Sequence, residues 1–283
     1  MKFGIFGINN GLLADPGIAS RAVKAAEGAG FESVWTGEHI VLPDPQAPPS
    51  PSAPQTPFAD TSTWLAFLAG QSETLKLGTG IIILPQRNPV ELAKELATVD
   101  VASRGRLLFG LGAGYLEPEF RAMGIPFEDR GARTDEYIDA IKALWTQKNP
   151  TFAGETVRFA GIDAHPRPVQ NPHPPVHVGG HSSPAFRRAV RRGNGWYGFF
   201  VDHERGAAYL KELAQIEQAE GRDAALGTLE LSITPLPRAS VDDALRFRDM
   251  GIDRLTLIPD TKDEDHLLRW IDETASSMLK QAS

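Results

Sequence analysis

Short apolar runs alternate along this chain with stretches in which apolar residues recur at helical spacing. Most of these runs are apolar throughout, not at every second residue, which is typical of a parallel sheet covered on both faces. The strand-like runs lie at 2–8, 33–39, 75–84, 106–114, 175–180, 195–200, 229–237 and 254–260. The helical stretches of the first half lie at 15–30, 60–73, 88–103, 117–124 and 130–145.

Eight β-then-α units predict an α/β fold, the (β/α)₈ TIM barrel, with loop insertions at its C-terminal face. A single such barrel commonly runs to about 250 residues, so we expect residues 1–283 to form one domain. A doubly wound sheet is the alternative. The first strand ends in "GINNGLL", however, and this lacks the glycine fingerprint that often follows the first strand of that fold.

Two stretches interrupt the alternation. Residues 43–57 contain seven prolines and predict a stiff, irregular loop. Because this loop follows the second strand, we expect it at the C-terminal face, where barrel enzymes bind substrate; a plain surface excursion is the alternative. Residues 146–174 predict a hairpin followed by an extended, proline-rich insertion.

Composition and charge exclude several classes of function. The net charge is −7, so no global basic field attracts nucleic acid, and we expect no such partner. The chain has no cysteine, which excludes disulfides, thiolate zinc sites and a cysteine nucleophile. The apolar start "MKFGIF" is too short for a signal peptide, and no apolar run approaches the roughly 18 residues of a membrane span. We therefore expect a soluble, cytoplasmic protein without a membrane partner.

The C-terminal ends of the predicted strands are where a barrel enzyme places its chemistry. Four of these ends are rich in glycine, which lets the backbone approach a ligand closely and leaves N–H groups free. Several such loops around one barrel indicate a large flat or anionic cofactor that lies across them. Besides Gly7 after the first strand, they contain Gly78, Thr79, Gly80, Ile81, Gly112, Ala113, Gly114, Tyr115, Gly179, Gly180, His181 and Ser182.

His39 ends the second strand and is the candidate acid/base, since imidazole titrates near neutrality. A lone histidine is often structural, but its strand-end position beside Glu38 favours a functional role. Adjacent strand residues face opposite sides of a sheet, so we do not expect both side chains to face the site. Four further histidines look like a metal set, but Pro174 and Pro175 prevent a helix that would align them, so we expect no metal. They are His165, His173, His177 and His181.

A basic helix is predicted directly after the glycines at 179–180. Ser183 as N-cap and Pro184 at the first helical position begin it. Arg187 and Arg188 lie near the helix N-terminus, where the macrodipole makes a cation unfavourable by about 0.3–1 kcal/mol. A bound anion would offset this cost, so we predict that the loop holds a phosphate beside these two arginines. A solvated basic face is the alternative.

Three segments together resemble the luciferase-like monooxygenase superfamily of (β/α)₈ barrels. They are "WTGEHIVLP" (35–43), residues 75–145 from "LKLGTGIIILPQRNP" to "DEYIDAIKALW", and "PRPVQNPHPPVHVGGHSSPAFRRAVRRGNGWYG" (166–198). They occur in the order and spacing of that superfamily. Within it, "GEHIVLP" and "HPPVHVGGHSSPAFRRA" are similar to the branch that uses the 5-deazaflavin coenzyme F420.

The resemblance implies a homodimeric oxidoreductase that transfers a hydride between coenzyme F420 and a small organic substrate. It places the coenzyme ring over a strand bulge at Thr79, Gly80 and Ile81, with a non-proline cis peptide between the last two, and the phosphate on residues 179–182. It assigns proton transfer to His39. The other residues expected at the site are Glu38, Gly112, Ala113, Gly114, Arg187 and Arg188 for the coenzyme, and Tyr115 to orient the substrate.

The chain departs at two positions from the sugar-phosphate dehydrogenases that use this coenzyme. Tyr115 stands where they carry a glutamate, and "FFVDHE" (199–204) stands where they carry a lysine, which argues against a sugar-phosphate substrate. Two alternatives remain. One is an FMN-dependent monooxygenase supplied with reduced flavin by a partner reductase, since a deazaflavin activates oxygen poorly. The other is a non-catalytic flavin-binding barrel, against which His39 counts.

Overall fold

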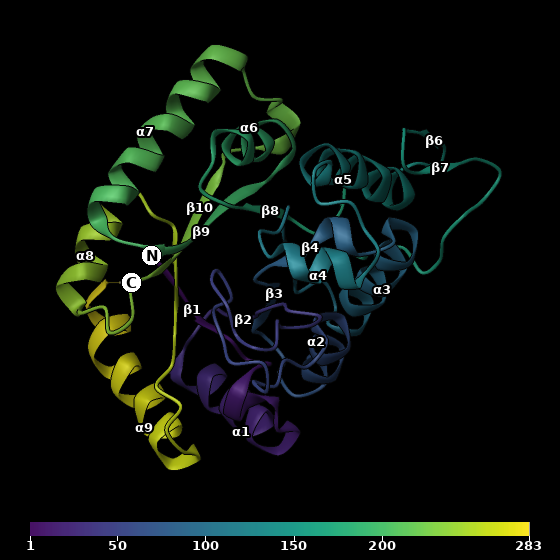
Figure 1. Ribbon diagram of the computed structural model, residues 1–283. Coiled ribbons are helices and arrows are strands. Elements are labelled where there is room, and N and C mark those ends of the chain that lie inside the picture. The colour runs from purple at the N-terminus through teal and green to yellow at the C-terminus, as the bar shows by residue number, and fades with distance from the viewer. Residues whose placement is uncertain (283) are drawn as a thin grey trace.

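Eight parallel strands close into a barrel in the computed structural model, which describes residues 1–282 (Figure 1). Each strand pairs with the next barrel strand along the chain, and the first pairs with the last to close the ring. The predicted TIM barrel is therefore confirmed, and each predicted strand-like run contains its strand, except that β9 extends one residue beyond its run, to Val201. The barrel strands are β1 (Lys2–Phe6), β2 (Ser33–Thr36), β3 (Lys76–Thr79), β5 (Leu107–Gly112), β8 (Val176–Gly179), β9 (Gly195–Val201), β10 (Glu230–Pro235) and β11 (Arg254–Leu257).

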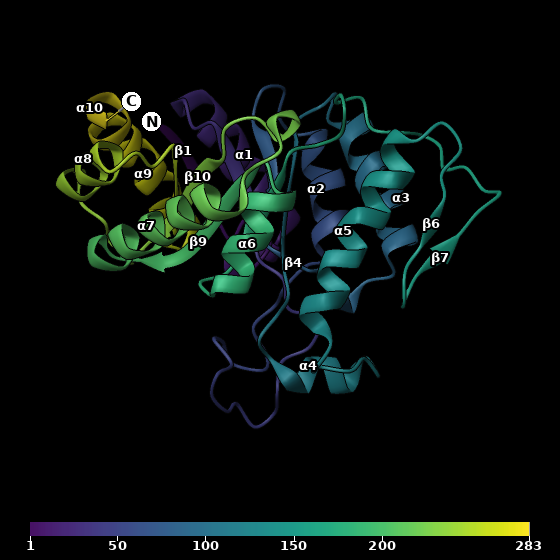
Figure 2. The same ribbon diagram turned by 90° about the horizontal axis from the view of Figure 1, so that it is seen from above.

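Helices between the strands cover the outer face of the barrel (Figures 1 and 2). They are α1 (Pro16–Ala29), α2 (Thr61–Ala69), α3 (Pro89–Ala102), α5 (Arg130–Thr146), α6 (Ser183–Arg192), α7 (His203–Glu220), α8 (Val241–Asp249) and α9 (Glu264–Thr274), with α10 (Lys280–Ala282) near the C-terminus. The short helix α4 (Glu117–Ala122) follows β5 and lies on the same side of the molecule as the dark blue loop 43–57 (Figure 2). Over residues 1–282, no helix combines the length and the apolar character that a membrane crossing requires.

Helix starts follow the capping chemistry of the sequence, with one correction. Asp15 caps α1 by accepting a hydrogen bond from the Ile18 N–H, and Pro16 occupies the first turn as predicted. Helix α6 begins one residue earlier than predicted, because Ser182, not Ser183, has the extended backbone of an N-cap. Ser183 is the first helical residue, and its hydroxyl donates to Glu212 on α7.

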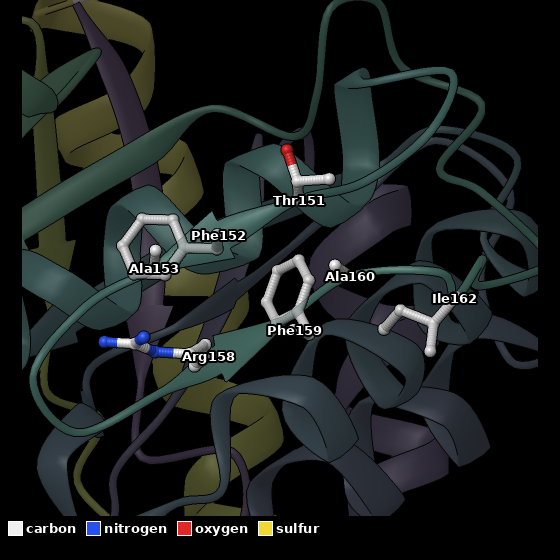
Figure 3. A pocket seen from close by; sticks show the side chains of 7 residues that line it. All are labelled: Thr151, Phe152, Ala153, Arg158, Phe159, Ala160 and Ile162. Atoms are coloured by element: carbon white, nitrogen blue, oxygen red, sulfur yellow. The ribbon is translucent and has the colours of Figure 1, made fainter.

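The predicted hairpin forms from β6 (Phe152–Ala153) and β7 (Arg158–Phe159), which pair antiparallel beyond α5 (Figure 1). Glu136 on α5 fixes it by accepting from three successive N–H groups of the hairpin turn. These bonds outweigh the effect of burial and lower the pKa of Glu136. An open concavity of about 710 Å³ lies against the hairpin, outside the barrel (Figure 3). Its lining residues are Thr151, Phe152, Ala153, Arg158, Phe159, Ala160 and Ile162.

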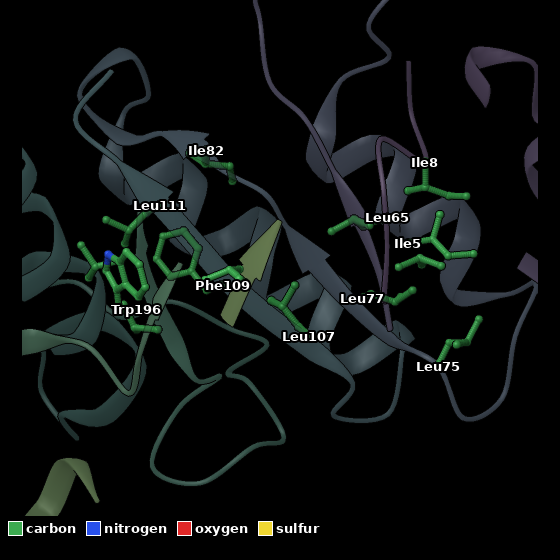
Figure 4. Packing of buried hydrophobic residues seen from close by; sticks show 14 of the residues in the cluster. Ile5, Ile8, Leu65, Leu75, Leu77, Ile82, Leu107, Phe109, Leu111 and Trp196 are labelled. Carbon is green, nitrogen blue, oxygen red and sulfur yellow. The ribbon is translucent and has the colours of Figure 1, made fainter. Parts of the chain in front are cut away.

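The apolar core lies between the barrel and its helices (Figure 4). Alternate strand residues such as Ile5, Leu77 and Phe109 point outward into this layer and meet helix residues such as Leu65, and all of them are fully buried. Their strand neighbours point into the barrel. This explains why the runs are apolar throughout, since both faces of each strand are covered.

The barrel interior is filled by two stacked aromatic rings. Trp35 on β2 and Tyr197 on β9 have ring planes 2° apart and ring centroids 5.4 Å apart. Both are buried, and their polar atoms are satisfied, because Trp35 Nε1 donates to Ser33 and the Tyr197 hydroxyl bonds to Thr234. Glycine makes room for the stack, since a Cβ at Gly78 would lie 2.3 Å from the Trp35 ring.

A buried charge network plugs the N-terminal end of the barrel. Arg254 is 1% exposed and donates to both Glu32 and Glu230. Burial alone would raise the pKa of Glu230, but the charges of Arg254, His177 and Lys2, with a hydrogen bond from Lys2, together outweigh it and lower that pKa to about 2. Burial, reinforced by the same arginine, lowers the pKa of His177 to about 4, so this inward-facing imidazole stays neutral. His177 is therefore part of the plug and not of a metal site.

We predict that Gly78→Ala lowers the free energy of unfolding by about 3 kcal/mol or more, because the added methyl group overlaps a ring that cannot move. Chemical denaturation of the wild type and the variant measures the difference. Gly28→Ala is the matched control, because Gly28 lies in α1 with no atom within 4 Å of an added Cβ. The control should gain about 0.5–1 kcal/mol. Equal stability of the two variants would show that the Trp35 ring can shift to accommodate the added methyl group.

Candidate active site

The C-terminal ends of the barrel strands, here called the rim, carry the predicted site residues. The proline-rich loop 43–57 is held there on both sides. Asn9 after β1 donates to the carbonyl groups of Gly37, which precedes the loop, and Ala59, which follows it. The Gly37 N–H returns a bond of 2.8 Å to the Asn9 side chain. Asn9 is fully buried, so the sequence at the end of β1 determines where this loop leaves and rejoins the rim.

His39 is held by a buried carboxylate from another part of the chain. Its Nδ1 lies 3.2 Å from Glu119 Oε2, and the other carboxylate oxygen accepts the Ile40 N–H at 2.9 Å. Glu119 lies on α4 and its side chain is 0% exposed, whereas that of His39 is 9% exposed. The carboxylate can only accept, so the neutral histidine carries its proton on Nδ1. In the part of the chain that the structure describes, His39 Nε2 has no protein hydrogen-bond partner, and the His39 side chain is partly exposed.

Glu38 and His39 have different partners, but strand alternation is not the reason, because both lie beyond the end of β2 at Thr36. The Glu38 carboxylate accepts the Ile83 N–H at 2.5 Å and is bound by the guanidinium of Arg87. Burial alone would lower the pKa of Arg87, but Glu38 and Asp60 raise it above its usual value, so the cation is permanent. Glu38 therefore fixes the backbone segment beyond β3. It is buried, so it supports the rim from inside the protein.

A bulge interrupts β3 at the predicted coenzyme platform. Gly78 pairs with Leu108 and Ile82 pairs with Leu111. The chain therefore advances four residues from β3 to β4 while β5 advances three, which leaves one extra residue in the bulge. The peptide between Gly80 and Ile81 is cis, as the resemblance implied. The short strand β4 (Ile82–Ile83) continues beyond the bulge.

Neighbouring residues leave space for this bulge and hold it. The Thr79 hydroxyl donates to the Gly110 carbonyl and accepts the Gly110 N–H, which replaces lost ladder bonds. A Cβ at Gly112 or Gly179 would lie 2.3 Å or 2.6 Å from the Ile81 side chain. The predicted residues of strands 3, 4 and 5 are thus brought together around Ile81.

Tyr115 stands beside His39, with ring centroids 6.3 Å apart. Gly114 before it has a φ of +81°, and a side chain there would overlap Ile83, so glycine is required at this turn. Ala113 between the glycines is half-buried. Tyr115 is exposed at the rim, and partial desolvation together with the charge of Glu119 raises the pKa of its hydroxyl, which keeps it protonated. It can therefore donate a hydrogen bond to a substrate.

The loop after β8 has the features of an anion site. Gly180 has a φ of +125°, and a Cβ there would lie 2.9 Å from Ala185. Within residues 1–282, the backbone N–H groups of His181, Ser182 and Ser183 have no protein acceptor, and they lie at the N-terminus of α6. A phosphate fits such a set of donors. Both FMN and coenzyme F420 carry one, so this loop suits either.

The His181 side chain is engaged elsewhere. Its Nε2 accepts the Phe199 N–H at 3.0 Å, and its ring stacks on Tyr209 at 5.0 Å. Burial and the charge of Arg205 lower the pKa of His181, which keeps Nε2 free to accept. The loop therefore offers backbone N–H groups to an anion while the imidazole fastens it to β9.

The structure contradicts the predicted role of Arg187 and Arg188. Arg187 donates to Glu220 at the end of α7, and Arg188 is buried against Asp135 on α5, at 2.9 Å and 2.7 Å. Both guanidinium groups therefore join α6 to its neighbours and do not reach the phosphate loop. The alternative prediction, that these arginines form a solvated basic face of the helix, is also wrong for Arg188, whose side chain is only 5% exposed.

The four histidines that resembled a metal set lie in separate surroundings. His165 bonds to Asp163 on the surface, His173 packs near Trp145, and the other two belong to the β8 loop and the barrel plug. No three His, Asp or Glu side chains within residues 1–282 converge in a way that could hold a metal.

Sequence reasoning missed Glu119 and Asn9. Glu119 belongs to the motif "LEPEF", and the pairing of a buried Glu with a His eighty positions earlier has no local signal. The arrangement as a whole supplies an oriented imidazole, a phenol and a platform with an anion loop. It can bind a flat, phosphate-bearing coenzyme and move a proton beside it.

Comparisons with known proteins found similar sequences and similar folds. The family model of the luciferase-like monooxygenases matches residues 1–282. An uncharacterised protein of Mycobacterium tuberculosis is 30% identical over 263 residues, which are 89% of this chain and 91% of that protein. The FMNH₂-dependent dimethylsulfone monooxygenase of Pseudomonas putida is 38% identical over 133 residues, 46% of this chain and 36% of that enzyme. A solved F420-dependent secondary alcohol dehydrogenase, in complex with an F420–acetone adduct, superposes with a TM-score of 0.81 at 16% identity, covering 100% of this chain and 99% of that one.

We predict that Glu119→Ala releases His39 from its single tautomer and exposes the Ile40 amide to exchange. Losing the acceptor should also lower the free energy of unfolding by about 1–3 kcal/mol. NMR of ¹⁵N-histidine reports the tautomer, and hydrogen exchange reports the amide. Glu117→Ala is the control, because Glu117 lies on the same helix but makes only an exposed pair with Arg121. An unchanged tautomer in Glu119→Ala would refute the orienting role.

Proposed function

The chain belongs to the luciferase-like monooxygenase family, and from this premise we propose that it transfers a hydride between coenzyme F420 and a small organic substrate. The single observation that carries the proposal is the His39–Glu119 pair beside the β3 bulge. Hydride transfer to or from a C–O group requires a proton to move at the oxygen. An oriented imidazole with a free Nε2 is suited to that role.

The residues around the bulge would hold the coenzyme. Its ring would lie over Gly80 and Ile81, and its phosphate would meet the N–H groups of residues 181–183. When bound, F420 supplies a ring carbon, C5, that gives or accepts the hydride. Gly112 and Gly179 leave the space that Ile81 occupies, because a side chain at either position would displace Ile81. Thr79 and Glu38 hold the platform from behind.

His39 would exchange the proton with the substrate oxygen through Nε2. Glu119 keeps the other ring nitrogen protonated, so the lone pair of the neutral imidazole is on Nε2, the nitrogen that faces away from Glu119. The carboxylate also stabilises the imidazolium that forms when His39 accepts a proton. Tyr115, protonated at neutral pH, would donate a second hydrogen bond to the substrate and fix its orientation.

An FMN-dependent monooxygenase is the second candidate. Relatives named as FMNH₂-dependent dimethylsulfone monooxygenase and as the oxygenase component of trigonelline monooxygenase favour it. This chain spans only 36% and 44% of the length of those two enzymes. Solved structures that align with the whole of this chain include two F420-dependent enzymes, at 15–16% identity, and a monooxygenase from Streptomyces bottropensis, at 22% identity, so the shared fold favours neither candidate. A non-catalytic barrel would have no use for a buried carboxylate that orients a histidine.

A titration of the apoprotein with F420 and with FMN at matched salt tests the coenzyme. We expect F420 to bind more tightly, measured as quenching of tryptophan fluorescence. Gly180→Val should weaken binding of both by about 100-fold or more, because its side chain blocks the close approach of a phosphate.

Gly227→Val is the matched control for that variant. Gly227 also has a positive φ, of +68°, but no atom lies within 4 Å of an added Cβ and the residue is remote from the phosphate loop. Its coenzyme affinity should equal that of the wild type. Tighter binding of FMN than of F420 would transfer the assignment to the second candidate.

His39→Gln should slow hydride transfer by about 10²–10⁴-fold, the usual contribution of a general acid–base group. Single-turnover absorbance of the coenzyme with small ketones and alcohols measures the rate. The affinity for the coenzyme should stay unchanged, because the imidazole acts on the substrate. Wild-type turnover in this variant would remove His39 from the mechanism.

A further inference from the structure

A second strand irregularity lies across the barrel from the β3 bulge. In the pairing of β9 with β10, Phe199 faces Thr234 but Val201 faces Pro235, so Phe200 is an extra residue. Phe200 has a φ of +54°, a conformation that bulky side chains rarely adopt. Bulges of this kind are common beside active sites, where they redirect a side chain. Here the result is an aromatic ring that remains 39% exposed at the rim.

The bulge joins Phe200 to a line of aromatic side chains. Its ring centroid lies 4.2 Å from that of Phe199, which in turn lies 4.9 Å from that of Phe6 on β1. The Phe6 ring borders the β3 bulge, because a Cβ at Gly80 would lie 3.4 Å from it. The line therefore extends from β9 to the platform on which the coenzyme is proposed to lie.

The same line continues to the acid–base pair. Gly37 is enclosed by two rings, since a Cβ there would lie 3.3 Å from Phe6 and 3.6 Å from Phe58. Phe58 meets the His39 ring edge-on at 5.2 Å. We call the set Phe6, Phe58, Phe199, Phe200 and Tyr115 the aromatic arc.

Two further apolar side chains, Val41 and Leu236, follow barrel strand ends as the arc residue Tyr115 does. Val41, Tyr115, Phe200 and Leu236 are all exposed, and each lies at or just beyond the C-terminal end of a different barrel strand. Exposed apolar groups that gather at one place mark a binding surface. Within residues 1–282, the charged group that contacts His39 is the carboxylate of Glu119. Of the nearby cations, Arg87 is paired with Glu38 and Asp60, and Arg130 donates to backbone carbonyl groups and packs over the Phe127 ring. An anionic substrate would therefore meet a like charge beside His39.

We propose that the aromatic arc binds an uncharged substrate with an apolar chain or ring, whose oxygen reaches His39 while its hydrocarbon part lies along the arc. This inference rests on the proposed hydride transfer and names the substrate class of the same site. Phe200 is a specificity-determining residue. His181 positions it, because its imidazole holds the Phe199 N–H at the start of the bulge.

Binding of 2-alkanones, from 2-butanone to 2-decanone, tests the substrate class without turnover. The protein is loaded with the oxidised form of whichever coenzyme binds more tightly, and affinities are measured by NMR titration. Each added methylene should raise the affinity about fourfold until the arc is covered. In levulinate a carboxylate replaces the terminal methyl group of 2-pentanone. Levulinate should bind at least about tenfold more weakly than 2-pentanone.

Phe200→Ala should lower the affinity for 2-octanone about tenfold and leave 2-butanone nearly unaffected, because only the longer chain reaches the bulge. Phe200→Leu should restore most of the loss. Phe67→Ala is the matched control, since Phe67 is an exposed phenylalanine on α2, outside the barrel, and should change neither affinity.

Three results would overturn the inference. They are equal affinity along the series, levulinate binding as tightly as 2-pentanone, and identical behaviour of the Phe200 and Phe67 variants. The hydride-transfer proposal fails separately. Affinity that rises with chain length but no hydride transfer with any ketone or alcohol would refute the reaction and support the apolar arc.

Discussion

The stack of Trp35 on Tyr197 inside the barrel is the contact on which the rest of the site depends. It fills the space that eight strands enclose and forms the floor beneath the rim. A ring of that size is compatible with the barrel only if facing residues give up their side chains, as Gly78 does. Once the floor is filled, the plug around Arg254 closes the N-terminal end, and chemistry is confined to the C-terminal end. The glycines of β3, β5 and β8 thus serve packing and site geometry together.

The close packing of the barrel also explains which parts of the fold and the site could be predicted from the sequence. Eight continuous apolar runs are visible because each strand is covered on both faces, and glycine loops at strand ends are visible because they break those runs. Helix caps are local, so the error at Ser183 was one residue. Partners far apart in the chain leave no such trace. The pattern of α6 showed where Arg187 and Arg188 lie on the helix, but their carboxylates come from α5 and α7.

Glu119 is the clearest case of a candidate site residue that local sequence patterns hide. It follows Glu117 and Pro118 in a short polar helix, where an exposed carboxylate is the ordinary expectation. Only the fold brings α4 over the end of β2 and turns this one glutamate inward against His39. The helix therefore has a charged outer face and a single buried carboxylate. A strand-end histidine can be recognised from sequence, but the group that orients it cannot.

Three backbone irregularities build the rim, and each is held by a side chain from outside its own strand. The β3 bulge is held by Glu38 and by the Gly110 backbone, the left-handed Gly114 by Arg130, and the β9 bulge by His181. An irregular strand end held only by its own bonds would relax toward regular pairing. Because each of these is fixed from a neighbouring element, the β3 bulge, His39 and the aromatic arc keep one mutual geometry. The β8 loop takes part in two of these functions, since its backbone N–H groups suit a phosphate while His181 sets the position of Phe199. The proposed coenzyme site and the proposed substrate-binding arc are thus joined by a hydrogen bond between the β8 loop and β9.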